Sequence, residues 1–408
     1  MSKPLRNLIA LSLSLLPALA GAASAPREPV KGGGYYGKSL ETIEIVADEA
    51  PVTLANTVLA TVKKGRWFGV RERKGDLVGI QFFGGRNLRQ GWVQARDVRE
   101  IRDEDVDLAA EALKLAREFD PNVNVAALAA RVAALAARVA QAAADAASAR
   151  EKAMQISVQL FGREGFGYDA TPRTLDRVLE EKRGNCLSLS LLYLCAAGKL
   201  KMPFRMLPFP KHALIRYDDG VEQFNIEPSM GGMVFVNDAH MRQLYGPPEG
   251  ISWTLLSKPQ TMTMLYSDIG SRLGDQKRHA EAERCFTRAI EINPNYGVAY
   301  YNWGTLLAAM DQHALACDKF SRAARLHPRY PEVFNNWGSS LGKLGDFQGA
   351  CDKFALSVKL DPQSAMAYLN WGVALLALQK REEALEKFEK AVEQQSSLKP
   401  FIDEALRQ

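Results

Sequence analysis

Three side chains in the middle of the 408-residue chain, Cys186, His212 and Glu227, have the residue types of an activated thiol nucleophile. Cys186 directly precedes the apolar stretch Leu187–Ala197, and the residues before it, Gly184 and Asn185, are typical of a helix start. A cysteine in the first turn of a helix lies near the positive end of the helix dipole, which favours the thiolate. The position therefore predicts a reactive cysteine.

A second cysteine of this helix, Cys195, is predicted to be a core residue. It follows Cys186 by about two and a half turns and so faces roughly the opposite side of the helix.

A β-hairpin is predicted to bring His212 next to Glu227. The strands would be His212–Tyr217 and Val221–Glu227, with Asp219-Gly220 as a two-residue loop. In that register His212 lies directly opposite Glu227, and Asn225 lies one diagonal away on the same face as a supporting residue. A carboxylate beside an imidazole fixes its tautomer and raises its basicity. The spacing leaves open whether Cys186 reaches the other ring nitrogen.

Taken alone, each residue could have a purely structural role. A buried cysteine often packs as a small apolar residue, and a buried histidine often only forms hydrogen bonds within the core. Three residues in this order, with matching register, favour an activated nucleophile instead.

The motifs around these residues resemble a known family. Three runs carry the resemblance: the segment from Arg183 to Leu194, Pro210-Lys211-His212, and Asn225-Ile226-Glu227-Pro228-Ser229. Together they resemble the transglutaminase-like superfamily of papain-type cysteine enzymes, in a bacterial branch often joined to tetratricopeptide repeats.

The resemblance implies an α+β domain over residues 104–258, with Cys186 as nucleophile, His212 as base and Glu227 as orienting acid. Glu227 stands where better-characterised members carry Asp, and Leu187 where they often carry an aromatic residue.

Two helices are predicted to lead into this domain. Asp103–Phe119 has one apolar face, and apolar residues recur at alternating spacings of three and four between Val125 and Ala142. Arg131, Arg138 and Asp145 argue against a membrane span there. The mostly small seam residues favour a helix packed on the domain over a free coiled coil.

The chain begins with the pattern of a secretory signal over residues 1–25. Lys3 and Arg6 precede a short apolar run, and small residues follow it. The pattern predicts export, most simply to the periplasm of a Gram-negative bacterium, with no integral membrane span after cleavage.

Residues 36–101 contain short β-rich runs at 57–62, 67–72, 77–82 and 91–94 with turn signals between them. Gly91-Trp92-Val93 and the run before it resemble bacterial SH3-like domains, which implies a small all-β barrel that binds peptides or cell-wall material. Trp92 is either a core residue of a tethering module or, with Trp67, part of a ligand groove.

Residues 263–408 carry an internal repeat of 34 residues, seen in three Asn-Trp-Gly triplets and four phenylalanines. This period is typical of tetratricopeptide repeats, an all-α solenoid of helix pairs. The repeats would span 263–296, 297–330, 331–364 and 365–398, with Phe401–Leu406 as a capping helix. In the first repeat Asp268-Ile269-Gly270 replaces Asn-Trp-Gly.

Two sets of residues recur in these repeats. Asn302, Asn336 and Asn370 resemble the groove-facing position of such proteins, and they are either ligands for a peptide or consensus residues without one. Cys317 and Cys351 also share a repeat position, too far apart for a disulfide, and are predicted to be reduced.

Composition narrows the function classes. The net charge of +5 is small for this length and does not indicate a nucleic-acid binder. No phosphate-binding or dinucleotide-binding glycine motif occurs, and the five histidines lack metal-ligand spacing, so neither a cofactor nor a metal is predicted.

Two functions remain. One is an exported cysteine hydrolase or acyl-transferase acting on amide bonds of a protein, peptide or cell-wall substrate. The other is a non-catalytic periplasmic assembly protein that uses its repeats and an idle α/β domain to bind a protein or peptide.

Overall fold

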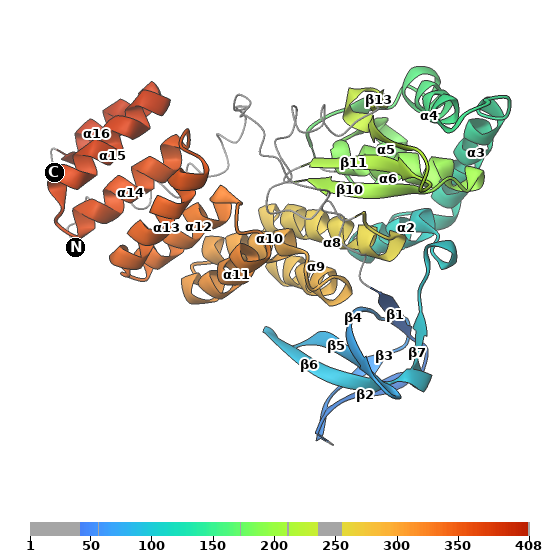
Figure 1. Ribbon diagram of the computed structural model, residues 1–408, viewed down its shortest axis with the longest axis horizontal. Coiled ribbons are helices and arrows are strands. Elements are labelled where there is room, and N and C mark those ends of the chain that lie inside the picture. The colour runs from blue at the N-terminus through green and yellow to red at the C-terminus, as the bar shows by residue number, and fades with distance from the viewer. Residues whose placement is uncertain (1–40, 56, 172, 210–211, 236–254, 407–408) are drawn as a thin grey trace. The chain divides into compact units, whose positions relative to one another are not determined.

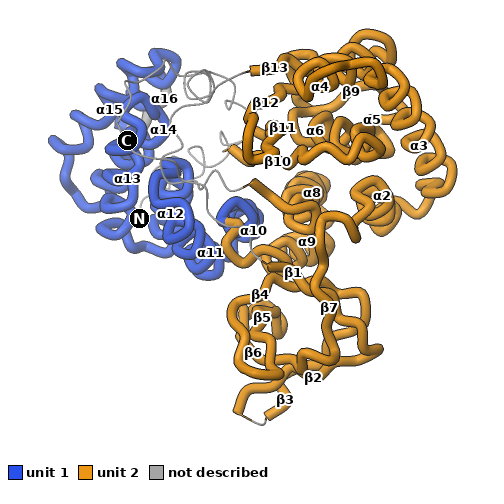
Figure 2. Tube along the Cα trace, turned by 45° about the vertical axis from the view of Figure 1, so that its right-hand side comes forward, with its two compact units in different colours: residues 1–27, 297–408 blue, residues 28–296 orange. Residues whose placement is uncertain are grey.

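The structure is a computed structural model that describes residues 41–406 apart from 56, 172, 210–211 and 236–254 (Figure 1). The predicted signal sequence, with Lys3 and Arg6, and the Pro210-Lys211 pair lie outside the described residues. The described chain forms two compact units that divide between Tyr296 and Gly297 (Figure 2). The first helix pair of the predicted repeats therefore belongs to the same unit as the domains before it.

The N-terminal module, residues 41–101, is all β. Its strands form one antiparallel arrangement in the order β3-β2-β6-β5-β4-β1-β7. The strands are β1 (Thr42–Ile45), β2 (Glu49–Leu54), β3 (Thr57–Lys63), β4 (Trp67–Lys74), β5 (Leu77–Gly84), β6 (Asn87–Gln94) and β7 (Val98–Glu100). The four predicted runs correspond to β3, β4, β5 and β6, whereas β1, β2 and β7 were not predicted.

Trp92 is not part of the buried core of this module. The core consists of aliphatic residues and two phenylalanines, Phe68 and Phe82. Trp92 is half-buried, and the Lys74 ammonium lies 4.9 Å from the centre of its ring. Of the two roles considered for Trp92, the core role is therefore wrong.

The β module packs against helix α9 (His279–Ile292) through β4. A Cβ added at Gly69 would lie 2.6 Å from the carbonyl oxygen of Ile292, so glycine permits the close approach. Arg66 pairs with the buried Glu291, and Arg86 donates to Glu283 at 3.1 Å. The module is thus attached to the first helix pair of the repeats.

The middle domain is α+β, as predicted. Its helices are α2 (Leu108–Phe119), α3 (Val125–Ala142), α4 (Ala149–Ser157), α5 (Leu175–Glu181) and α6 (Cys186–Ala196). An antiparallel sheet has the order β10 (Phe204–Phe209), β11 (His212–Asp218), β12 (Gln223–Glu227) and β13 (Met233–Phe235). Helix α6 packs on β11, and a short parallel pair, β8 (Gly167–Tyr168) with β9 (Arg183–Gly184), precedes α6.

The lead helices differ from the prediction only at their start. Residues Asp103–Asp105 form a separate 3₁₀ turn, and α2 begins after its N-cap Asp107, whose side chain accepts from two backbone N–H groups. Helix α3 is long and apolar enough to cross a membrane by length and composition. Its seam residues Leu128, Val132, Leu135 and Val139 are buried, and it packs on α2 and α6.

Four helix pairs follow in residues 255–406, which are described without a gap. The pairs are α8 (Lys258–Asp275) with α9, α10 (Gly297–Ala309) with α11 (His313–Leu326), α12 (Pro331–Lys343) with α13 (Phe347–Leu360), and α14 (Ala365–Ala377) with α15 (Arg381–Gln394). Helix α16 (Lys399–Leu406) follows them, as expected of a cap.

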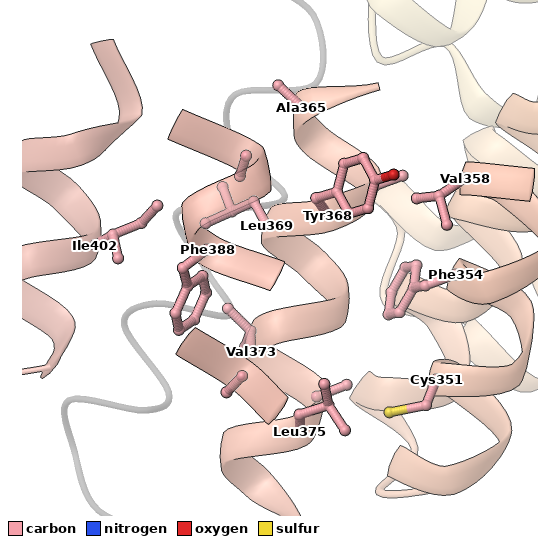
Figure 3. Packing of buried hydrophobic residues seen from close by; sticks show 14 of the residues in the cluster. Cys351, Phe354, Val358, Ala365, Tyr368, Leu369, Val373, Leu375, Phe388 and Ile402 are labelled. Carbon is pink, nitrogen blue, oxygen red and sulfur yellow. The ribbon is translucent and has the colours of Figure 1, made fainter. Parts of the chain in front are cut away.

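Glycine and phenylalanine at fixed repeat positions pack the two helices of a pair. A Cβ added at Gly338 would lie 2.7 Å from the Phe354 ring, and one at Gly372 2.4 Å from the Phe388 ring. Figure 3 shows Phe354 and Phe388 inside the buried cluster of the last two pairs, with Cys351, Val373 and Leu375 near them. The 34-residue period of the sequence thus reflects packing contacts that recur in each helix pair.

Candidate active site

The start of α6 positions Cys186. Asn185 is the N-cap, and its side-chain oxygen accepts from the backbone N–H of Ser188 at 2.9 Å. Gly184 is required before it, because an added Cβ would lie 2.5 Å from Ser188 Oγ and 3.1 Å from Val178. Cys186 is therefore the first residue of the helix, as predicted, and its side chain is half-buried.

The predicted hairpin forms, but its register differs by two residues. Arg216 pairs with Asn225 and Asp218 with Gln223, so the loop has four residues, 219–222. The Asp219 carboxylate accepts from the backbone N–H groups of Val221 and Glu222, which favours this longer turn over the predicted two-residue loop. The predicted pairing of His212 directly opposite Glu227 is wrong.

His212 and Glu227 nevertheless meet. His212 Nε2 lies 2.6 Å from Glu227 Oε2. A register shift of two keeps every side chain on its face, so Glu227 moves from the direct to the diagonal position and still reaches the ring. The predicted neighbourhood of the imidazole and the carboxylate is confirmed.

Glu227 is fully buried, and two further donors hold it. Its Oε1 accepts from the backbone N–H of Ser229 at 3.0 Å and from Ser229 Oγ at 2.5 Å. A buried carboxylate is stable only when its oxygens are bonded. Ser229 is thus a site residue that the sequence analysis did not single out, although it ends the Asn-Ile-Glu-Pro-Ser run.

Cys186 contacts the same imidazole. Burial lowers the pKa of His212, but hydrogen bonds with Cys186 and Glu227 and the charges of both outweigh it, raising the pKa to about 9. The three residues therefore form a chain of contacts from thiol to imidazole to carboxylate.

Asn225, predicted as a supporting residue, contacts Arg216. Its side-chain oxygen accepts from Arg216 Nε at 2.9 Å, and both residues are buried. The register places Asn225 opposite Arg216 and away from His212. The supporting role of Asn225 stays a prediction.

Two tyrosines and an aspartate near Cys186 were not predicted. Tyr168 lies beside Gly184 in the β8–β9 pair, and burial together with the charges of Cys186 and Glu227 raises its pKa. Asp268 lies in α8, and Tyr296 follows α9. Burial and the charges of Asp268 and Cys186 raise the pKa of Tyr296. No local sequence signal joins residues this far apart.

The other four thiols differ from Cys186. Burial raises the pKa of Cys195 and of Cys285 strongly, and raises that of Cys317 and of Cys351 to about 11. All five cysteines are reduced. Cys195 lies in α6 as a half-buried residue near Asp107 and Lys258, separate from the triad.

The asparagines predicted for the repeat groove form bonds between repeats. Asn336 Nδ2 donates to Tyr301 Oη at 3.1 Å, and Asn370 Nδ2 donates to Asn335 Oδ1 at 3.0 Å. Both residues are buried, and Asn302 is half-buried. These contacts favour the consensus-residue alternative for Asn336 and Asn370.

Within the residues that the structure describes, no group of three or more His, Cys, Asp or Glu side chains is arranged to hold a metal ion.

Comparison with known proteins supports the domain assignment. Residues 126–254 match the family model of the transglutaminase-like superfamily, and residues 265–296 match that of a tetratricopeptide repeat. A UPF0162 protein of Xylella fastidiosa is 23% identical over 235 residues, which are 50% of this chain and 80% of the relative.

Solved structures resemble about a third of the chain. MamA is 19% identical over 35% of this chain and 88% of its own, with a TM-score of 0.30. YrrB, described as a TPR protein with an unusual peptide-binding site, is 29% identical over 33% of this chain and 69% of its own, with a TM-score of 0.31. PilF of Pseudomonas aeruginosa is 21% identical over 34% of this chain and 63% of its own, with a TM-score of 0.32.

With the helix pairs described above, the two family matches show that the chain contains a transglutaminase-like domain followed by a helical repeat region with a tetratricopeptide repeat.

Proposed function

We propose that this protein is a cysteine-dependent hydrolase or acyl-transferase that acts on amide bonds. One observation carries the proposal: the imidazole of His212 bonds to the buried Glu227, and Cys186 is near enough to the same imidazole to raise its pKa. A nucleophile, a base and an orienting acid in contact form the arrangement that activates a thiol.

The raised pKa of His212 favours a protonated imidazole at neutral pH. In the first step Cys186 Sγ attacks the amide carbonyl carbon, and the imidazolium gives its proton to the leaving nitrogen as the C–N bond breaks. The product is a thioester on Cys186 and a free amine.

In the second step water or another amine attacks the thioester carbon. His212 takes a proton from this acceptor, the C–S bond breaks, and the thiolate is restored. The backbone N–H of Cys186 is among the first four of α6, which have no partner within the helix, and it is the donor we assign to the developing oxyanion.

The repeat region supports a second element of the function, the binding of a protein or peptide partner, because solenoids of helix pairs offer extended surfaces. Its presence also favours the alternative of a non-catalytic assembly protein. The two functions differ in whether Cys186 is reactive.

Three finer elements rest on the sequence patterns alone. We propose that the protein is exported to the periplasm after loss of its signal sequence, that the N-terminal module is an SH3-like barrel, and that this module binds cell-wall material. Mass spectrometry of the mature N-terminus tests the first, with loss of about 20 to 25 residues expected. Co-sedimentation with purified peptidoglycan tests the last.

Alkylation of the full chain tests the enzyme proposal. At about pH 6.5 iodoacetamide should label Cys186 faster than the four other thiols, whose pKa values burial raises. His212→Ala should remove most of this preference. The matched control His279→Ala, a histidine outside the triad, should not. Equal labelling of all five cysteines, unchanged by His212→Ala, would favour the non-catalytic alternative.

A further inference from the structure

A group of exposed apolar side chains lies on the elements next to the triad. Six large apolar residues are exposed in the described part of the middle domain, and five of them, each 47–49% exposed, come from these elements. We call the five the apolar patch: Met154, Val158, Tyr168, Met230 and Met233. Exposed apolar side chains that gather in this way usually mark a contact surface.

The turn after Glu227 forms the middle of the apolar patch. Residues Pro228–Met230 form the 3₁₀ turn η5, and two glycines follow with left-handed φ angles of 70° and 75°. The backbone N–H of Gly232 donates to the carbonyl oxygen of Glu227 at 3.0 Å, which closes the turn. Met230 and Met233 therefore belong to the same turn that begins with the triad acid.

Helix α4 holds this turn from one side. Ser157 Oγ donates to the carbonyl oxygen of Gly232 at 2.8 Å, and α4 lies beside β13, which begins with Met233 (Figure 1). A Cβ added at Gly232 would lie 2.6 Å from the Cβ of Ser157, so glycine permits this close approach. Met154 and Val158 are four residues apart and share the side of α4 that borders Ser157. The apolar patch thus continues from the turn onto α4.

Tyr168 connects the apolar patch with the nucleophile. In the β8–β9 pair it lies opposite Gly184, two residues before Cys186, and the backbone N–H of Asp169 donates to the carbonyl oxygen of Gly184 at 2.9 Å. Strand β8 also packs against η5, and η5 packs against α6. Burial and the charges of Cys186 and Glu227 raise the pKa of Tyr168, in agreement with this position. The apolar patch therefore begins beside the triad and extends to α4.

Charged residues of the same elements form ion pairs of mixed sign. Arg150 of α4 pairs with Glu222 at 2.5 Å, and Arg173 pairs with Asp169 at 3.1 Å. A membrane of anionic lipids is held by clustered basic residues, which such pairs do not supply. Thioether and aliphatic side chains instead favour an apolar ligand, and methionine adapts its shape to different ones.

We propose that the apolar patch binds a large apolar side chain of a polypeptide substrate, next to the amide bond that Cys186 attacks. The inference rests on the proposed cysteine chemistry and narrows its substrate to a protein or peptide with an apolar residue near the reacting bond. The continuity of the patch with the triad carries it, because one turn supplies the buried Glu227 and the exposed Met230.

Alkylation of Cys186 in the full chain by two peptidyl chloromethyl ketones tests the proposal. The acetyl-Phe-Phe and acetyl-Ser-Ser probes carry the same reactive group and differ only in the side chains offered to the patch. Each rate is divided by the iodoacetamide rate of the same protein, which removes differences in thiol reactivity. The Phe probe should react at least about tenfold faster than the Ser probe, because burial of one large apolar side chain is worth about this factor.

Variants of the apolar patch should lose this preference. Met230→Ser and Tyr168→Ser should each lower the ratio of the two rates about threefold or more, since each removes part of the apolar contact area. Met230→Leu and Tyr168→Phe keep that area and should stay within about twofold of the wild type. Val221→Ser is the matched control, because Val221 is exposed in the loop between β11 and β12, and it should leave the ratio unchanged.

The outcomes separate this inference from the enzyme proposal. A ratio near one in the wild type, or a ratio that Met230→Ser and Tyr168→Ser leave unchanged, would overturn the role of the apolar patch, while iodoacetamide still reports the reactive thiol. Absence of preferential labelling of Cys186 by iodoacetamide in the wild type would overturn the enzyme proposal, and this inference with it.

Two other occupants of the apolar patch would also overturn the inference. If the wild type is a dimer in sedimentation velocity and Met230→Glu makes it a monomer, the patch binds a second copy of the chain. If the wild type co-sediments with phosphatidylglycerol vesicles and Met230→Glu does not, the patch binds a membrane. We expect Met230→Glu to change neither measurement.

Discussion

His212 and Glu227 form their 2.6 Å contact across a diagonal of the β11–β12 pair. Ile215 pairs with Ile226, so the next step of the register places Glu227 opposite Leu214, two residues from His212. A glutamate side chain is one methylene longer than an aspartate, and at a diagonal position this extra length helps the carboxylate to reach the ring. The glutamate in place of the aspartate that the resemblance implied is thus compatible with the geometry.

The first prediction concerns the protonation of His212. Glu227→Gln removes a charge that favours the imidazolium, so the His212 pKa should fall from about 9 by at least about one unit. Cys186→Ala should also lower it, because the thiol contact raises it as well. NMR titration of ¹³C-labelled histidine, assigned with His212→Gln, measures both. Glu389→Gln, an exposed glutamate, is the control. A His212 pKa unchanged in both variants would contradict the contacts described here.

The second prediction is a pH dependence of stability. The folded-state pKa of His212 is about 9, above the ordinary value of about 6.5, so its contribution is complete below pH 6.5 and is lost as pH rises through 9. The loss amounts to at most about 3 kcal/mol. Calorimetry between pH 6 and 10 should therefore show a steeper fall in the melting temperature for the wild type than for His212→Gln. Parallel curves for the two proteins would contradict this sign.

The repeat region supplies the third prediction. Phe354 is buried in the cluster of the last two helix pairs (Figure 3). Gly338 leaves room for its ring. Phe354→Ala should cost about 3–5 kcal/mol, through lost burial and the cavity left behind. Leu356→Ala on the same helix, where the side chain is 40% exposed, should cost less than about 1 kcal/mol. Urea unfolding followed by the fluorescence of the repeat tryptophans measures both, and equal losses would mean that the repeat register is wrong.

Whether a feature of this structure could be predicted from the sequence depends on how far apart in the sequence the contacting residues lie. The helix pairs could be predicted because residues equivalent to Gly338 and Phe354 recur in every repeat. The start of α6 could be predicted because asparagine, here Asn185, is preferred as a helix N-cap. The side-chain alternation of strands put His212 and Glu227 on one face even though the loop length was wrong, because the error was an even number of residues.

Contacts between distant segments could not be predicted in this way. Nothing in the local pattern indicates that Tyr296 lies near Cys186. The attachment of Arg66 to Glu291 joins residues 225 positions apart. Strand β2 contains Pro51, which argues against a strand, yet its alternating buried residues Ala50 and Val52 follow a strand period.

The last prediction concerns the attachment of the β module to the first repeat. Glu291 is 2% exposed; it pairs with Arg66 and Arg288 and accepts from the backbone N–H of Phe83. Arg66→Ala leaves this buried carboxylate short of one donor, which costs about 1–3 kcal/mol. The backbone amides of β4 and β5, the strands that contact α9, should then exchange hydrogen faster, while those of β11 and β12 keep their protection.

Arg86→Ala is the matched control for this attachment. Arg86 pairs with Glu283 at 2.9 Å, but the Glu283 side chain is 16% exposed against 3% for Glu291, and pairs nearer the surface contribute about 0–1 kcal/mol. Hydrogen exchange at β4 should therefore change much less in Arg86→Ala than in Arg66→Ala. Equal effects of the two substitutions would show that Glu291 is not the point at which the module is held, and that the close approach of Gly69 to Ile292 carries the attachment instead.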